Sequence, residues 1–149
     1  MIRKPLIQIT EAVLNSLIEN KVEERKDLDY KRDLPERNDE QKREFLSDIS
    51  SFANTVGGDL IFGINAPSGD GVPVDIRGVP TGSLEDGKFW IENVLRTGLQ
   101  PRLTGYELHA VPLASGRAVL IIRIPKSWAS PHRVVFRDHG HFYARNSSG

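Results

Sequence analysis

Residues 45–63, FLSDISSFANTVGGDLIFG, constrain the fold more than any other part of the chain. Four apolar residues recur at i, i+4, i+7 and i+11 and predict one buried stripe on a helix: Phe45, Ile49, Phe52 and Val56. The helix is expected to begin at Asn38 or Asp39, since either can cap it. Gly57-Gly58 ends it, because glycine tolerates the left-handed conformation. A strand with an apolar centre is expected over 59–65.

Further elements follow from the same kind of pattern. Helical spacing predicts a helix over 10–20 and another from Ser83 to Gly98, with Asp86 in a capping-box position. The expected buried side of this second helix comprises Phe89, Trp90, Ile91, Val94 and Leu95. Strands are expected over 28–32, 74–79, 103–113 and 117–124, and as a hairpin of 134–136 with 141–145 turning at 138–140. The strand over 117–124 is apolar enough to be central.

This order of elements predicts a fold of the α/β or mixed α+β class, in one domain over residues 1–149. The domain is expected to hold a mixed sheet and about three helices. A chain of 149 residues can bury a sizeable core. The polar end at 146–149 resembles the start of a linker, so the domain could be the N-terminal part of a longer protein.

Composition narrows the function classes. The chain has no cysteine, which excludes disulfides, thiol catalysis and cysteine-ligated zinc. It shows no apolar run of the ~20 residues that a membrane helix needs and no secretory signal, so a cytoplasmic protein without a membrane partner is expected. It also lacks the glycine-rich loops that bind ATP phosphates and the Gly-x-Ser-x-Gly context of serine hydrolases.

Charge is unevenly distributed along a chain whose net charge is zero. Residues 96–149 hold eight basic and two acidic side chains, +6, together with all four histidines, whereas residues 45–95 hold two basic and seven acidic side chains, −5. A basic last third indicates an anionic partner. The alternative is that this third only offsets the acidic middle of the fold.

Three blocks of sequence resemble the Schlafen-type AlbA domain, a family often described as DNA-binding. The first block is Glu24-Arg-Lys-Asp-Leu-Asp-Tyr-Lys31. The second is residues 48–58, DISSFANTVGG, followed by Leu-Ile-Phe-Gly at 60–63. The third comprises Pro101, residues 119–125, residues 131–132 and residues 142–145. The resemblance spans nearly the whole chain and implies the fold class given above.

The resemblance also implies chemistry, because some members of the family are endoribonucleases with three acidic residues. Two of these acids match Glu24 and Asp29, and such a pair can hold Mg²⁺ or Mn²⁺. The third follows the strand that ends at Gly63, where this chain has Asn65 and Ala66. Asp59 or Asp70 are the candidate replacements.

The same pair of acids has a structural interpretation. Glu24 and Asp29 can instead form surface ion pairs with the basic residues near them: Arg25, Lys26, Lys31 and Arg32. Lys31 is the family's strand lysine, and it either neutralises a bound phosphate or compensates Asp29. The candidate catalytic residues are thus Glu24, Asp29 and Lys31. Asn54 is expected to hydrogen-bond the turn that follows its helix.

Nucleic-acid binding is the leading functional hypothesis, because arginine forks match phosphate oxygens and aromatic residues interleave with them. The candidate binding residues are Lys31, Arg32, His132, Arg133, Arg137 and Arg145. His139 and His141 could instead share a metal, or simply belong to the turn. The expected partner is DNA or RNA, contacted through phosphates.

Two alternatives remain open from sequence. One is a metal-dependent nuclease with a degenerate acidic site, in which Glu24 and Asp29 hold Mg²⁺ or Mn²⁺; otherwise no cofactor is expected. The other is an interaction or assembly module of a larger regulatory protein, either as a homo-oligomer or followed by a further C-terminal domain. Bacterial members of the family often stand at the N-terminus of longer proteins and are described as transcriptional regulators.

Overall fold

The computed structural model describes residues 1–136 and 139–142. Three α-helices form: α1 (Glu11–Glu19), α2 (Asp39–Ala53) and α3 (Leu84–Gly98), with short 3₁₀ helices η1 (Leu6–Gln8) and η2 (Thr81–Ser83). The longer strands are β1 (Leu28–Lys31), β2 (Gly58–Phe62), β6 (Glu107–Pro112), β7 (Ala118–Ile124), β8 (Arg133–Phe136) and β9 (His139–Phe142). The shorter ones are β3 (Ile64–Asn65), β4 (Asp75–Ile76) and β5 (Leu99–Gln100).

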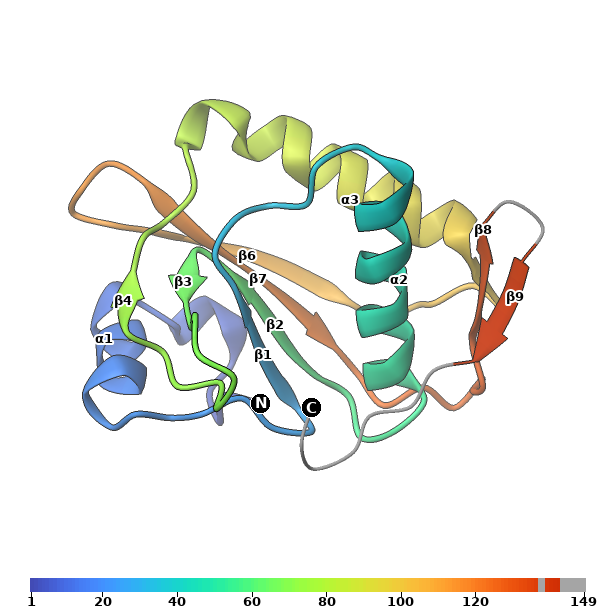
Figure 1. Ribbon diagram of the computed structural model, residues 1–149, viewed down its shortest axis with the longest axis horizontal. Coiled ribbons are helices and arrows are strands. Elements are labelled where there is room, and N and C mark those ends of the chain that lie inside the picture. The colour runs from blue at the N-terminus through green and yellow to red at the C-terminus, as the bar shows by residue number, and fades with distance from the viewer. Residues whose placement is uncertain (137–138, 143–149) are drawn as a thin grey trace.

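A four-stranded mixed sheet in the order β1-β2-β7-β6 forms the centre of the molecule (Figure 1). Strand β1 runs parallel to β2, and the other pairs are antiparallel. Strand β7 lies between β2 and β6, which confirms the prediction of a central strand. The predicted mixed α+β domain is also confirmed. Two smaller sheets, β3-β4 and β5-β8-β9, flank it.

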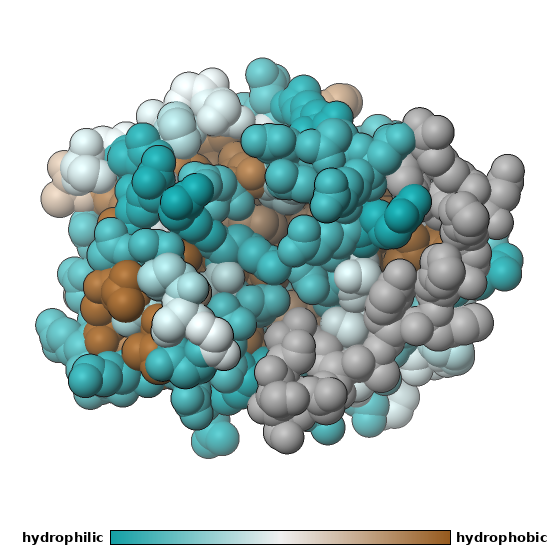
Figure 2. All heavy atoms as spheres, viewed as in Figure 1, coloured by the Kyte–Doolittle hydropathy of each residue, from teal (hydrophilic) through white to brown (hydrophobic). Residues whose placement is uncertain are grey.

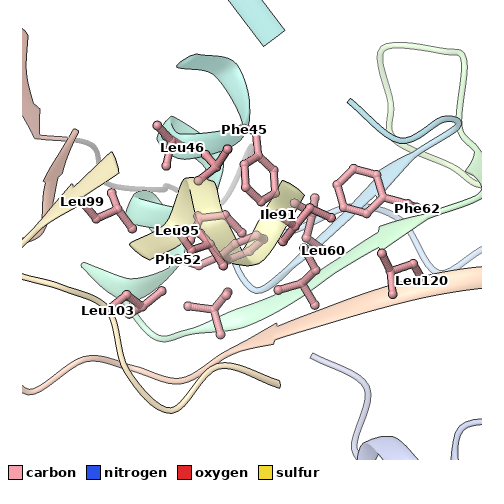
Figure 3. Close-up of a cluster of buried hydrophobic side chains, with 14 of the residues drawn as sticks. Phe45, Leu46, Phe52, Leu60, Phe62, Ile91, Leu95, Leu99, Leu103 and Leu120 are labelled. Carbon is pink, nitrogen blue, oxygen red and sulfur yellow. The ribbon is translucent and has the colours of Figure 1, made fainter. Parts of the chain in front are cut away.

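Each face of the central sheet covers a separate hydrophobic core, because side chains alternate along every strand. Leu60, Phe62, Leu120 and Ile122 point to the core shared with α2 and α3, part of which is drawn in Figure 3. Ile61, Val119 and Ile121 point to the core that α1 and the N-terminal segment close. Away from the cores, the face shown in Figure 2 is mainly hydrophilic.

Helix α2 begins and packs as its sequence predicts. Asn38 is its N-cap, and the side chain accepts a hydrogen bond of 2.9 Å from the Gln41 amide. Phe45, Ile49 and Phe52 are buried on one face. The helix, however, ends at Ala53, three residues before Val56, so Val56 lies in the turn and is 48% exposed. The predicted buried stripe is therefore wrong in one of its four members, Val56.

Several other expectations need correction. Phe89 is 76% exposed on α3, although the neighbouring apolar residues Ile91, Val94 and Leu95 are buried. Ser83 precedes α3 without a capping hydrogen bond from its side chain. The strand predicted over 59–65 is divided at Gly63, whose φ of +111° interrupts β2 before β3.

The predicted strand boundaries also shift. The strands expected over 74–79 and 103–113 shorten to β4 and β6, because proline, glycine and turn residues occupy their ends. In the last hairpin, β9 already begins at His139, which pairs with Phe136, so residues 139 and 140 belong to the strand and not to the expected turn. Residues 143–145 of the expected strand lie outside the described residues.

Candidate functional site

Strand β1 and the segment before it bring the two predicted acids together. The Glu24 amide donates a hydrogen bond of 3.0 Å to the carbonyl of Gly71, which fixes this segment beside the 66–72 loop. The Glu24 and Asp29 carboxyl groups share a hydrogen bond. Burial, followed by the charge of Asp29 and this hydrogen bond, raises the pKa of Glu24 to about 7. The Tyr30 amide and the Lys31 charge oppose the rise only in part.

Lys31 lies among three carboxylates. Its Nζ is 3.3 Å from Asp48 Oδ2, 3.5 Å from Glu44 Oε1 and 3.9 Å from Asp29 Oδ2. Burial lowers the pKa of Lys31, but the charges of Asp48, Asp29 and Glu44 raise it overall. Of the two roles predicted for Lys31, this arrangement supports compensation of neighbouring acids.

Sequence reasoning missed the two acids that α2 contributes. Glu44 and Asp48 are four residues apart and so lie on the same, polar side of the helix. That spacing was a visible signal, but nothing in the sequence shows that this side of α2 faces the end of β1. The cluster thus consists of Glu24, Asp29 and Lys31 from the β1 region with Glu44 and Asp48 from α2.

The candidate replacements for the third acid are engaged elsewhere. Asp59 is fully buried and pairs with Arg123 at 2.8 Å, and its second oxygen accepts from the Ile2 amide. Arg123 also donates to the carbonyls of Ile2 and Lys4, which holds the N-terminal segment on the sheet. Asp70 is exposed and accepts from Ser68 and from the Val72 amide within its own loop.

No three or more acidic or histidine side chains are grouped to hold a metal ion within residues 1–136 and 139–142. Asn65 and Ala66, the family's position for the third acid, lie on β3 and directly after it. The acidic cluster consists of the Glu24–Asp29 pair and the ion pairs of Lys31.

The Asn54 side chain bonds to a segment that the sequence did not indicate. Its Nδ2 donates to the His132 carbonyl at 2.9 Å and its Oδ1 accepts from the His132 amide at 2.7 Å. Asn54 thus clamps the connection between β7 and β8, which is far away in sequence. The Thr55 hydroxyl group bonds back to carbonyls at the end of α2.

His132 lies in the interior, which corrects its predicted place on a binding surface. It is fully buried. Its Nδ1 donates to the carbonyl of Pro101, which can only accept, and its Nε2 contacts the Ser127 hydroxyl. Both ring nitrogens are thus occupied inside the protein.

Of the four remaining predicted binding residues, two are exposed and two lie outside the described residues. Arg133 is exposed on β8 and donates to Gln100 Oε1 at 3.0 Å. Arg32 is exposed and pairs with Asp33 at 2.9 Å. Arg137 and Arg145 lie outside the described residues.

Two exposed arginines that sequence reasoning did not single out lie close to each other. Arg96, in the last turn of α3, and Arg102 line one surface hollow, whose other lining residues are Phe89, Glu92, Asn93 and Tyr106. Two further arginines of the last third have internal roles, since Arg117 donates to backbone carbonyls and Arg123 pairs with Asp59. The excess positive charge of residues 96–149 therefore lies only partly at the surface.

The family model described as Schlafen, AlbA_2 matches residues 24–149. The chain belongs to this family. The match begins at Glu24, the first of the two paired acids, and includes the Asn54 turn and the strands of the central sheet. The resemblance seen in the three sequence blocks is thus confirmed.

Solved structures share the fold at low sequence identity. The chain is similar to the N-terminal domain of an ATP-dependent DNA helicase RecG-related protein from Nitrosomonas europaea, with a TM-score of 0.60, 20% identity, and coverage of 90% of this chain and 89% of that one. It is also similar to the DIP2311 protein from Corynebacterium diphtheriae, with a TM-score of 0.50 and 20% identity. That match covers 93% of this chain but only 25% of DIP2311.

No curated protein matches the chain. Among the described helices, none combines the length and apolar character that crossing a bilayer requires.

Proposed function

We propose that this domain binds nucleic acid through phosphate contacts made by exposed arginines around the C-terminal end of α3. Membership of the AlbA_2 family fits a nucleic-acid-related role, and so does a fold shared with the N-terminal domain of a helicase-related protein. The observation that carries the proposal is the grouping of Arg96, Arg102 and Arg133 on this part of the surface.

The three arginines reach this surface from three different segments. Arg96 precedes β5 in the sequence and Arg102 follows it, and both side chains line the same hollow. Arg133 lies opposite Gln100 in the β5-β8 ladder and lines a second hollow with Pro101, the residue before Arg102. The two hollows are thus lined by consecutive residues, Pro101 and Arg102.

These guanidinium groups have suitable chemistry for phosphate. Arg96 donates to Asn93 and Arg133 donates to Gln100, and both of these partners are neutral amides. One acid, Glu92, lines the hollow that holds Arg96 and Arg102, so cations outnumber acids there. Arginine presents a planar fork of donors that binds two phosphate oxygens at once. Phosphate contacts carry no base information, so we expect binding with little sequence preference. Lys31 and His132 are left out of this interface because their polar atoms are engaged within the protein.

Fluorescence anisotropy with labelled single-stranded RNA, single-stranded DNA and duplex DNA over a range of salt concentrations tests the proposal. The triple variant R96A/R102A/R133A should lose affinity for every sequence alike. Each lost phosphate contact should lower the slope of log K against log salt, by about 2 in total for single strands and about 3 for duplex DNA.

A second triple variant, R37A/K42A/R43A, removes the same number of positive charges around the start of α2 and serves as the matched control. It should keep most of the affinity. Equal losses in the two variants would show that net charge alone is responsible, and absence of binding by the wild-type protein at low salt would refute the proposed function.

A metal-dependent nuclease is the second candidate. The observation that favours it is the direct contact of the Glu24 and Asp29 carboxyl groups, with Asp48 brought near through Lys31. If the pair acts on RNA, Mn²⁺ must displace the shared proton and Lys31 must move aside. Incubation of the purified protein with transfer RNA, with Mn²⁺ or with EDTA, tests this candidate. Metal-dependent cutting that E24Q abolishes would support it, and intact RNA at high protein concentration would exclude it.

A further inference from the structure

Trp128 is the most exposed large apolar side chain among the described residues, at 93%. It lies in the connection between β7 and β8. The other tryptophan, Trp90, instead packs against Phe45 with ring centroids 6.0 Å apart. A whole indole ring presented to solvent is the kind of surface feature that marks a binding site.

The backbone around Trp128 is held in place by the core of the domain. The Ser127 amide donates to the Ala53 carbonyl at the end of α2, at 3.1 Å. The Ala129 amide donates to Ser127 Oγ at 3.2 Å, and that hydroxyl contacts buried His132. The residues on both sides of Trp128 are thus anchored, so the indole ring projects from a fixed backbone.

One cation lies over this ring, and others line a hollow at the neighbouring turn. Lys126 Nζ lies 5.7 Å from the Trp128 ring centroid. The turn at Gly57 packs directly on this segment, since a Cβ at position 57 would lie 2.8 Å from the Lys126 amide nitrogen. Beside Gly57, exposed Val56 lines a hollow whose other side chains include three cations and one acid: Arg3, Arg25, Lys26 and Asp27.

We propose that Trp128 stacks on an unpaired base of a single-stranded nucleic acid, while Lys126 and the basic hollow contact its phosphates. The inference rests on the proposed function and specifies its partner. An aromatic platform next to a positively charged groove is the arrangement by which proteins hold single strands. Duplex DNA keeps its bases inside the helix and would use only the cations. Trp128 and Val56 are the large apolar side chains exposed here, and cations lie beside both, which matches a base better than a protein core.

The fluorescence of Trp128 itself provides a direct test. The W90F variant leaves Trp128 as the only tryptophan. Titration of W90F with an oligo(dT) of about 15 nucleotides should quench its emission, whereas a duplex of equal length should quench it much less. An emission that oligo(dT) leaves unchanged, under conditions where anisotropy shows binding, would overturn the inference.

Substitution separates this inference from the proposed function. W128A should weaken binding of oligo(dT) at least about five-fold, and W128F, which keeps a ring, should retain most of the affinity. I7A, which removes another exposed apolar side chain, is the matched control, since Ile7 is 83% exposed. Wild-type affinity in W128A, together with a loss in R96A/R102A/R133A, would refute the role of Trp128 and leave the proposed function intact.

A second copy of the chain is the competing occupant of this surface. Sedimentation of the wild-type protein and W128A over a concentration range distinguishes the two. Self-association that disappears in W128A would assign the surface to a protein contact and overturn the inference. Monomers in both cases are the expected result.

Discussion

Replacement of Glu24 by glutamine should change how the stability of this domain depends on pH. In the folded protein the pKa of Glu24 is raised to about 7 from an ordinary value of 4.5, chiefly by burial and by Asp29. Between these two values the unfolded chain releases a proton that the folded chain retains. The free energy of unfolding therefore falls as pH rises through this window, and the stabilising contribution of the proton is complete only below pH 4.5.

The size of the effect follows from the same shift. A difference of this size corresponds to at most ~3 kcal/mol. Glu24 is only half-buried, and solvent screening reduces the figure to about 1–2 kcal/mol. The proton belongs to the Glu24–Asp29 pair as a unit, because the two carboxyl groups are coupled. Glutamine is neutral at every pH and can still donate to Asp29. E24Q should therefore match the wild-type protein near pH 4.5 and exceed it by about 1–2 kcal/mol at pH 8.

Urea unfolding at pH 4.5, 6, 7 and 8 measures this difference, provided that the m-value stays constant. E23Q removes the same charge from the exposed neighbour Glu23 and is the matched control. It should follow the wild-type pH dependence. Parallel curves for E24Q and the wild-type protein, or a loss of stability in E24Q at pH 8, would refute the reasoning about the shared proton.

Two further substitutions probe the contacts that hold the site in place. N54A leaves the His132 amide and carbonyl without their side-chain partner. It should lower the free energy of unfolding, measured by urea denaturation, by about 2 kcal/mol. A loss below about 0.5 kcal/mol would contradict the clamp. D59N breaks the buried pair with Arg123 and should lower the free energy of unfolding by about 3 kcal/mol in the same assay. Hydrogen exchange of the Ile2 amide should become faster, because this amide loses its bond to the Asp59 carboxylate. An unchanged exchange rate would show that the pair does not hold the N-terminal segment.

Local periodicity predicted much of this fold. The stripe of Phe45, Ile49 and Phe52 identified α2, and the unbroken apolar run of β7 identified the strand that lies between two others. Periodicity failed at Val56 and Phe89, because a helical repeat does not show where a helix ends or how wide its buried face is. Those limits depend on packing partners elsewhere in the chain.

The candidate site was predicted less completely, because its contacts join distant segments. The family pattern singled out Glu24 and Asp29, which are five residues apart, and the structure brings their carboxyl groups together. The approach of Asp48 to Lys31 requires α2 to lie over the end of β1, and no spacing in the sequence shows this. His132 was predicted at the surface because it stands beside the basic residues of the last hairpin, but the Asn54 clamp and the contacts of its ring with Pro101 and Ser127 hold it inside.

The clamp between Asn54 and His132 also bears on the order in which the domain folds. The two residues are 78 positions apart, so their contact closes a long loop at a high entropic cost. Such a contact is expected to form after the sheet and α2 have already assembled. In a chevron plot, N54A should then leave the folding limb unchanged and raise the unfolding rate. Asn54, which lies in one of the sequence blocks that resemble the family, would then form its contact late in folding and slow unfolding. It would thus determine the lifetime of the native state.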